Sequence, residues 1–517
     1  MRQLMILEVS QKQAYIFAST RLRDNIANSE AICQVTDPAY FKLAAEAEGK
    51  DFDVERRLVY SGGGHTVLEF DSEEAAKDFA WLITRRVKGE FPEIELFVRV
   101  IPYDESQLPG ENLKRLSEEL EVKKSLRAAA FGQRTFGVER IMADTRKSQT
   151  AVEGVKALPW SRGEERRGDY TYPYQFNDLG NSENESSFIA VIHIDGNAMG
   201  KRVEELRRRL SREGMGWEDY KKSLRRFSDA IDRDFKAAFR EMEDQILSEA
   251  NKPALAKLKL KPQMIPLRKI ILAGDDVCFV TEGRIGLEAA RIFMEKLSAH
   301  KNSEDGKGYA ACAGVAIVHQ KYPFYKAYEL AESLCSNAKK YLAGFSGEDP
   351  EVNTHACSID WHIEYGSTAD SLEGVREAYE ALDKTRLELR PYLIEKATAA
   401  KVLDMEKTRR YGNFRRLILY LDSDRLDYAR GKIKGLREAI REGEIASEYY
   451  MKVRLLEDFA AAGHMREEEA QLDADTLAGL FSGKPDTRML CADTRDGKRR
   501  SLYFDAIELL DTFIGLE

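Results

Sequence analysis

Three aspartates lie where apolar runs of the sequence end. Asp195 follows the run Phe188–Ile194, and Asp275 and Asp276 separate the runs RKIILA and VCFVT. Carboxylate oxygens are the ligands that Mg²⁺ and Mn²⁺ prefer in proteins. Two such ions can activate a hydroxyl for attack on a phosphate and stabilise the leaving pyrophosphate. The three aspartates therefore predict a site for phosphoryl chemistry, provided that the fold brings them together.

The residues after Asp195 suit the same chemistry. Gly196, Gly200 and Lys201 put small residues and a basic one at the start of an expected helix, where a triphosphate can bind. Taken alone, an aspartate after a strand or an Asp-Asp pair in a hairpin is more often an ordinary turn. Taken together on equivalent strands, they favour a functional site, because two acidic tips that converge would otherwise repel each other.

The first hundred residues predict a unit in the order β-α-β-β-α-β. Leu4–Val9 and Glu95–Ile101 have strand patterns, and 72–88 has a helical one. Between them, RRLVY and HTVLEF flank Gly62, Gly63 and Gly64, and glycine permits the positive φ angles of a tight hairpin turn. This order is that of a ferredoxin-like domain.

The same order returns after a polar stretch. A strand at 187–194, a long helical region at 201–250, a hairpin around Asp275 and a strand at 309–318 make a second unit. In a ferredoxin-like sheet the first and third strands are neighbours, so Asp195 should lie beside Asp275 and Asp276. We therefore predict an α+β protein with two ferredoxin-like palm domains and a C-terminal all-helical domain. The expected boundaries are 1–140 (first palm), 141–187 (irregular linker), 188–370 (second palm, with the three aspartates) and 371–517 (helical).

Composition narrows the class of protein. The 517 residues carry a formal charge of −9 and are 43% hydrophobic, and no stretch approaches 18 apolar residues. The six cysteines include no C-x-x-C pair, which argues against a disulfide framework and a zinc knuckle. We expect a cytoplasmic protein without a membrane segment or targeting signal.

Several of these motifs resemble one family. HIDGNAMGKRV, ILAGDDVCFV and AGVAIVHQKYPFYKAYELAESLCSNAKKY resemble the second palm domain of the large polymerase/cyclase subunit of type III CRISPR effector complexes. QKQAYIFASTRLRDNIANSEAI and YSGGGHTVLEF resemble its first palm, and the helical tail resembles its C-terminal domain. The resemblance covers nearly the whole chain.

The resemblance implies a synthetase that makes cyclic oligoadenylates or related signalling nucleotides from ATP with two Mg²⁺ or Mn²⁺ ions. The metal ligands would be Asp195, Asp275 and Asp276. Gly274 would allow close approach of the nucleotide, Lys339 would contact phosphate, and the glycines of the first palm would bind a nucleotide without chemistry. The implied partners are ATP, CRISPR effector subunits and guide or target RNA.

The sequence also departs from the family pattern. Ala273 replaces the first glycine of the usual Gly-Gly-Asp-Asp, and Asn197 replaces the second carboxylate of the usual Asp-Gly-Asp. None of the seven histidines precedes an aspartate, so we expect no HD nuclease domain and no cleavage of DNA. The cysteine zinc site common between the palms is missing too.

Two other functions remain open at this point. One is an RNA-binding structural subunit with an inactive palm, which Ala273 and Asn197 favour. The other is a free-standing cyclase of the GGDEF or class III adenylyl type, although two palms in one chain already supply the pair that such enzymes form by dimerising. Basic stretches at 207–226 and 409–416 are more typical of solvated helix faces than of RNA contacts. Turn or core roles are expected for Ser61 and His65.

Overall fold

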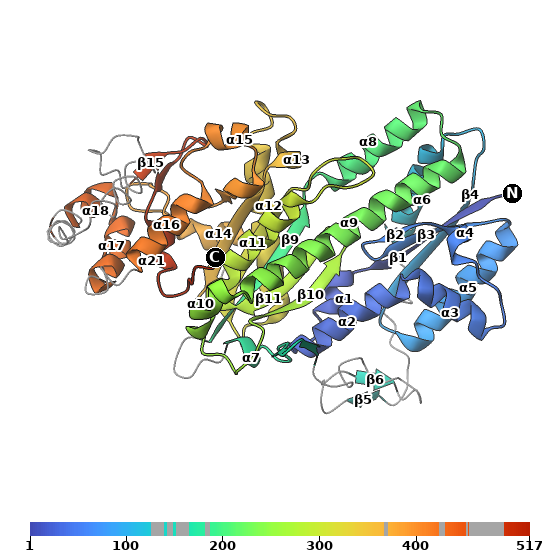
Figure 1. Ribbon diagram of the computed structural model, residues 1–517, viewed down its shortest axis with the longest axis horizontal. Coiled ribbons are helices and arrows are strands. Elements are labelled where there is room, and N and C mark those ends of the chain that lie inside the picture. Colours follow the sequence, from blue (N-terminus) through green and yellow to red (C-terminus); the bar gives the residue numbers. More distant parts are fainter. Residues whose placement is uncertain are drawn as a thin grey trace.

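The computed structural model describes residues 1–125, 139–141, 148–150, 165–180, 187–366, 371–422, 430–450, 453 and 491–517. Figure 1 shows the first palm (blue) at one end of the molecule, the second palm (green and yellow) in the middle, and the C-terminal helices (orange and red) at the other end. The predicted fold class, α+β with two palm sheets, is confirmed.

The first palm is a four-stranded antiparallel sheet in the order β2-β3-β1-β4. In β1, Met5 and Leu7 belong to one hydrophobic core and Leu4 and Ile6 to the other, because successive side chains of a strand point to opposite faces. The strands are β1 (Gln3–Ser10), β2 (Leu58–Gly62), β3 (His65–Phe70) and β4 (Glu95–Pro102). The helices are α1 (Lys12–Ile16), α2 (Leu22–Val35), α3 (Pro38–Ala47), α4 (Val54–Arg57), α5 (Glu73–Glu90) and α6 (Pro109–Ser125).

The second palm repeats this arrangement and extends it. Its sheet has the order β10-β11-β9-β12-β13-β14, in which the first four strands follow the ferredoxin-like order and β13 joins β12 in parallel. The strands are β9 (Phe188–Gly196), β10 (Leu267–Ala273), β11 (Asp276–Glu282), β12 (Ala311–His319), β13 (Ser358–Glu364) and β14 (Tyr392–Leu393). The helices are α8 (Met199–Arg212), α9 (Trp217–Ile246), α10 (Lys252–Ala256), α11 (Gly286–Ala299) and α12 (Phe324–Ala343).

Helix α12 lies directly on the backbone of β12. A Cβ at Gly314 would come within 1.9 Å of the Ala331 carbonyl oxygen, so only glycine allows this approach. The close packing fixes the height of α12 above the sheet. It therefore also fixes where Lys339, near the end of α12, stands over β9.

Helix α9 connects the two palms. Near its start Lys221 contacts Glu69 of β3, and Ser228 donates a hydrogen bond to the Ser61 carbonyl (2.9 Å). Toward its end Phe239 packs edge-on against Phe279 of β11, with ring centroids 5.5 Å apart. The long helical region expected at 201–250 is thus two helices, α8 and α9, and Gly214 in the loop between them has a φ of +64°.

The remaining described segments are small. In the expected linker, β5 (Glu139–Ile141) pairs with β6 (Ser148–Thr150), and β7 (Arg166–Arg167) pairs with β8 (Tyr170–Thr171) before α7 (Asn177–Gly180). These short strands carry too few residues for a periodic pattern to show in the sequence.

The C-terminal region is mainly helical but includes strands that an all-helical domain would lack. Its helices are α13 (Val352–His355, just after the second palm's last long helix), α14 (Leu372–Glu377), α15 (Ala400–Met405), α16 (Tyr411–Leu421), α17 (Arg430–Glu442), α18 (Glu444–Tyr450) and α21 (Phe504–Glu508). β14 adds to the palm sheet, and β15 (Cys491–Asp493) pairs with β16 (Arg499–Ser501). Two- and three-residue strands are too short for alternation to reveal them. Residues 482–490 (SGKPDTRML), whose composition predicts a loop, lie outside the described residues.

Among the residues described above, no helix is long and apolar enough to cross a lipid bilayer.

Candidate active site

Two of the predicted aspartates lie directly opposite each other on neighbouring strands. Asp195 near the end of β9 is paired in register with Asp276 at the start of β11. Asp275 occupies the adjoining turn, and the Gly196 N–H donates a hydrogen bond to its carbonyl oxygen (3.2 Å). A Cβ at position 196 would lie only 2.8 Å from the Cβ of Asp275, so glycine lets the turn close over the strand. The structure thus gathers the three carboxylates at one end of the sheet.

Burial and neighbouring negative charge raise the pKa of two of the three carboxyl groups, those of Asp275 and Asp276. Burial, followed by the charge of Asp195, raises the pKa of Asp275 to about 6. Burial, then Asp195 and Asp275, raises the pKa of Asp276 to about 7. Such a group of carboxylates suits a bound cation. The cation would offset both the repulsion between the negative charges and the loss of their hydration by burial.

One oxygen of Asp276 has no partner in the described structure. Its Oδ1 is buried without a hydrogen bond, and the nearest ring nitrogen, Nδ1 of His193, is 3.6 Å away and also unpaired. Burial lowers the pKa of His193 to about 4, so its ring is neutral at physiological pH and does not balance the carboxylates. The open oxygen is therefore available to a metal ion.

The donor set fits a hard divalent cation. All three side chains offer oxygen, which suits Mg²⁺ or Mn²⁺. Among the described residues, no three histidine, cysteine or acidic side chains are already gathered as a ligand cage. Mg²⁺ does not require one, because it commonly binds through one or two carboxylates and completes its shell with water and substrate phosphates.

Lys339 reaches this site from α12. Its Nζ lies 2.5 Å from Oδ2 of Asp195. Burial opposes the charge of Lys339, but Asp195 outweighs burial and raises the lysine pKa. The structure therefore places Lys339 beside Asp195, while the predicted phosphate contact stays a prediction.

The turn of the first palm meets the turn that carries Asp275. Gly63 and Gly64 have φ angles of +57° and +78°, and Gly274 has a φ of +63°, all in the left-handed region that favours glycine. A Cβ at Gly274 would stand 3.8 Å from the Gly63 backbone nitrogen. Gly62 belongs to β2, where Ser228 of α9 packs against it. Two backbones with little side-chain cover thus face each other beside the carboxylates.

Lys12 is a residue of this site that sequence reasoning missed. Its Nζ donates a hydrogen bond to the Gly63 carbonyl, and its methylene chain fills the space where a side chain at Gly64 would stand. Burial lowers the pKa of Lys12, while Asp276 is among the acids that act to raise it. The only signal in the sequence is a basic residue shortly after the first strand of a palm.

The structure does not bring Lys201, the basic residue that follows Asp195, into contact with the aspartates, and its nucleotide contact stays a prediction. Lys201 is on the exposed side of α8, with its side chain 53% exposed and its Nζ 4.0 Å from Glu205. Gly200 is also exposed, and a Cβ there would meet open space. Among the described contacts, neither residue touches the aspartates, because α8 turns away from the end of β9.

The two departures from the family motif have structural explanations. Asn197 is 4% exposed and donates its amide to the Ala356 carbonyl (3.1 Å), which ties the end of β9 to the segment before β13. Ala273 pairs with Asp276 at the base of the hairpin turn. Neither change removes one of the three carboxylates described above.

The weaker candidates have structural contacts. Ser61 Oγ lies 2.9 Å from Thr66 Oγ1 and donates to the Thr36 carbonyl, and the His65 ring packs edge-on against Tyr60. Burial lowers the pKa of His65 to about 4.

Most of the basic stretches are engaged within the fold. Arg209 and Arg226 both contact Glu304, and Arg415 contacts Glu288. These pairs agree with the interpretation of the stretches as helix faces.

Comparison with known proteins agrees with this geometry. Residues 188–343 match the family model of the Cas10/Cmr2 second palm domain. Csm1 of T. onnurineus has a similar fold, with a TM-score of 0.55 and 14% identity over 99% of this chain and 69% of that one. Two Csm1-Csm4 cassettes are also similar: one in complex with cA4 (TM-score 0.55, 14% identity, 98% and 69% coverage) and one with AMPPNP (0.52, 14%, 99% and 70%). No curated protein matches. Residues 188–343 thus match the Cas10/Cmr2 second palm domain, and the chain as a whole shares the fold of Csm1.

Proposed function

We propose that the chain is a metal-dependent nucleotidyltransferase that joins and cyclises nucleotides from ATP into cyclic oligoadenylate-type signals. The observation that carries the proposal is the group of Asp195, Asp275 and Asp276 on adjacent strands of a Cas10/Cmr2 palm. The backbone turn of the first palm lies against the turn of this group. Carboxylates and a bare backbone surface are what a polymerase-type site needs for metal and nucleotide.

In this proposal the aspartates hold two Mg²⁺ or Mn²⁺ ions. When bound, the ions supply Lewis acidity that activates a 3′-hydroxyl and stabilises the leaving pyrophosphate. Lys339 of α12 holds Asp195 in position and contacts the phosphates of the substrate. Lys12 contributes a second cation from the first palm. The two lysines flank the carboxylates from opposite palms, which suits a polyanionic substrate.

The glycines would allow the nucleotides close to the backbone. Gly274 and Gly196 serve the second palm, and Gly62, Gly63 and Gly64 serve the first, which binds a second nucleotide without carrying out chemistry. The complexes of a Csm1-Csm4 cassette with AMPPNP and cA4 support nucleotides as the ligand class.

The same comparison supports a multisubunit setting. The similar chains are solved together with Csm4, so we propose that this protein acts in the cytoplasm with CRISPR effector subunits and guide or target RNA. The rival function is a structural subunit with an inactive palm, which the substitutions at Ala273 and Asn197 favour. A free-standing homodimeric cyclase is less favoured, because both palms already meet within one chain.

Incubation with radiolabelled ATP and Mn²⁺, with and without a matched RNA-guided complex, tests the proposal. We expect labelled oligonucleotide from the wild type, and a loss of at least about 100-fold in Asp275→Ala/Asp276→Ala, because the first contacts to the metal are removed. Addition of a chelator should stop synthesis and leave the circular dichroism spectrum unchanged. Activity of the double variant within about threefold of wild type would reject the site, and absence of product from the wild type with the complex would favour the inactive subunit.

A further inference from the structure

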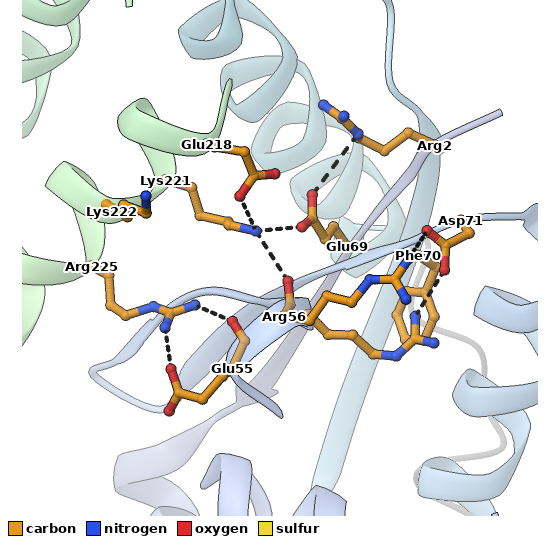
Figure 2. A pocket seen from close by; sticks show the side chains of 11 residues that line it. Arg2, Glu55, Arg56, Glu69, Phe70, Asp71, Glu218, Lys221, Lys222 and Arg225 are labelled. Atoms are coloured by element: carbon orange, nitrogen blue, oxygen red, sulfur yellow. Dashed lines mark hydrogen bonds and ion pairs between the residues drawn. The ribbon is translucent and has the colours of Figure 1, made fainter. Parts of the chain in front are cut away.

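A second cavity lies between the palms, away from the aspartates. It has a volume of about 520 Å³, and Figure 2 shows the first palm on one side of it and α9 on the other. Glu69, Phe70 and Asp71 line it at the end of β3, whereas the Gly63 turn precedes the start of that strand. At about 3.3 Å per residue, the six residues of β3 separate the cavity from the turn by roughly 15–20 Å. The cavity is therefore distinct from the carboxylate site.

The cavity is positively charged in an acidic protein. Six basic and four acidic side chains line it, which gives a formal charge of +2, while the whole chain carries −9. Its volume lies in the range of about 300–1,000 Å³ that is usual for small-molecule sites. A local excess of cations on a protein of this charge points to an anionic ligand.

Some of the cations hold the palms together. Lys221 has its side chain 6% exposed, and its Nζ lies 2.5 Å from Glu69 and 3.0 Å from the Arg56 carbonyl oxygen. Trp217 donates to the same carboxylate through Nε1 (2.5 Å). Arg225 contacts Glu55 and the Leu58 carbonyl. These contacts fix α9 to the first palm, so Lys221 and Arg225 belong to the frame of the cavity.

Three of the other four cations have only long or solvent-exposed carboxylate contacts. Arg2 has carboxylate contacts of only 4.0 Å, to Glu69 and to Glu105, and its guanidinium lies 5.0 Å from the centroid of the Tyr103 ring. Arg56 pairs with Asp71, but both side chains are more than 60% exposed. Lys222 is 67% exposed and 3.8 Å from Asp219. Exposed ion pairs of this kind contribute at most about 1 kcal/mol, so a multivalent anion can replace the carboxylates.

The chemistry of the lining selects among anions. Arginine presents a planar fork that matches phosphate oxygens, and two arginines with one lysine around one space suit several phosphates on a small molecule. Phe70 is 3% exposed, with the guanidinium of Arg57 4.9 Å from its ring centroid, so it offers no free face to a base. Recognition would thus be by phosphate alone.

We propose that this cavity binds a small polyphosphate, either pyrophosphate or the triphosphate of a nucleotide, through Arg2, Arg56 and Lys222 and without a metal ion. Because these three cations come from both palms, the ligand would cross-link α9 to the first palm. Strand β3 connects the Gly63 turn to Glu69 in the cavity. A ligand bound in the cavity would therefore restrict the movement of the backbone that faces Gly274. The inference does not depend on the catalytic proposal, because no metal and none of the three aspartates takes part.

Calorimetric titration of the full chain with pyrophosphate and with a non-hydrolysable ATP analogue, both in a chelator, tests this site. We expect saturable binding of both that weakens at least about tenfold in Arg56→Gln/Lys222→Gln, because charge-assisted contacts to phosphate are lost. Arg208→Gln/Lys77→Gln removes two equally exposed cations outside the cavity, with side chains 66% and 69% exposed, and should leave binding unchanged. Asp275→Asn/Asp276→Asn should also leave it unchanged.

Four outcomes would overturn the proposal. The first three are the absence of saturable metal-free binding, binding that the Arg56→Gln/Lys222→Gln variant retains in full, and binding of single-stranded RNA with none of either polyphosphate. Loss of metal-free binding in the aspartate variant would place the ligand in the carboxylate site and would equally overturn the proposal. Absence of synthesis by the wild type, with metal-free binding intact, would count against the catalytic proposal alone.

Discussion

At the scale of single residues, the environment of Asp276 is unfavourable to its own charge. It has a buried oxygen without a partner, two neighbouring aspartates and a neutral histidine. This arrangement destabilises the folded, metal-free protein. A bound cation would remove that destabilisation.

The pKa of Asp276 predicts how the stability of the metal-free protein depends on pH. The folded pKa of about 7 lies above the ordinary 3.8, so between these values the folded state binds more protons than the unfolded state. The free energy of unfolding should therefore fall as pH rises through this window. In Asp276→Asn the fall should be smaller, and the variant should be more stable than wild type at pH 8 but not at pH 4. Urea unfolding in a chelator measures this, with Asp219→Asn, at an exposed carboxylate, as the control. Equal pH dependence in Asp276→Asn and wild type would contradict the prediction.

Lys12 gives a second prediction at this scale. Lys12→Met keeps the length of the side chain but removes the cation beside the Gly63 turn, so we expect the KM for ATP to rise about tenfold, as for the loss of a charge-assisted contact to phosphate. Lys12→Arg should restore part of the affinity. Lys201→Met, which changes the exposed lysine of α8, should leave KM unchanged. A larger rise in KM in Lys201→Met than in Lys12→Met would instead assign the phosphate contact to Lys201.

At the scale of elements, the two hairpin turns that meet are the central feature. Gly63 has room for a Cβ, because its closest neighbour would be the His65 ring at 3.8 Å, but its φ of +57° strains any other residue. Substitution there would act through the backbone of the turn, and the turn lies against Gly274.

Gly63→Val should therefore displace the turn and abolish one of two nucleotide sites. Strain of this kind costs about 1–3 kcal/mol. Gly49→Val, at a φ of +68° with open space around it, carries similar strain far from the site and is the matched control. With the cavity site removed by Arg56→Gln/Lys222→Gln in every protein compared, we expect calorimetric titration with a non-hydrolysable ATP analogue and Mg²⁺ to give one site in Gly63→Val and two in both the Gly49→Val control and the otherwise wild-type chain. Two sites in Gly63→Val would mean that the glycines form only a turn.

The elements that sequence reasoning found share one property, which is length. Strands such as β9 and helices such as α12 carry enough residues for apolar periodicity to show, and the order of the strands then placed Asp195 beside Asp276. β14 has two residues, and its pairing depends on β13, which is distant in the chain. Lys12 could not be found by periodicity either, because Lys12, Gly63 and Asp276 come from three separate segments of the chain. The distance of Lys201 from the aspartates could not be predicted from the sequence either, because the direction of α8 depends on tertiary packing.

At the scale of the whole molecule, the C-terminal region is joined to the second palm by more than the chain. β14 extends the palm sheet, and Arg390 just before it is fully buried between Asp505 and Glu508 of α21. Its Nη1 lies 2.9 Å from Asp505 and 2.6 Å from Glu508.

Arg390→Met should lower the free energy of unfolding by about 3–5 kcal/mol, because two carboxylates would stay buried without their cation. Arg430→Gln, which breaks a partly exposed pair with Asp422, should cost no more than about 1 kcal/mol. Urea unfolding followed by fluorescence compares the two variants. A small effect of Arg390→Met would mean that water reaches the cluster.

The contact between the Gly63 and Gly274 turns also predicts how the rate of synthesis depends on protein concentration. Enzymes that build such a site from two separate chains lose it on dilution, since their halves must find each other. Here one chain carries both palms, and α9 contacts both of them. The effective concentration of one palm around the other is therefore independent of the protein concentration. Synthesis per molecule should then be the same at low and high protein concentration, and any dependence on dilution would report the dissociation of other subunits.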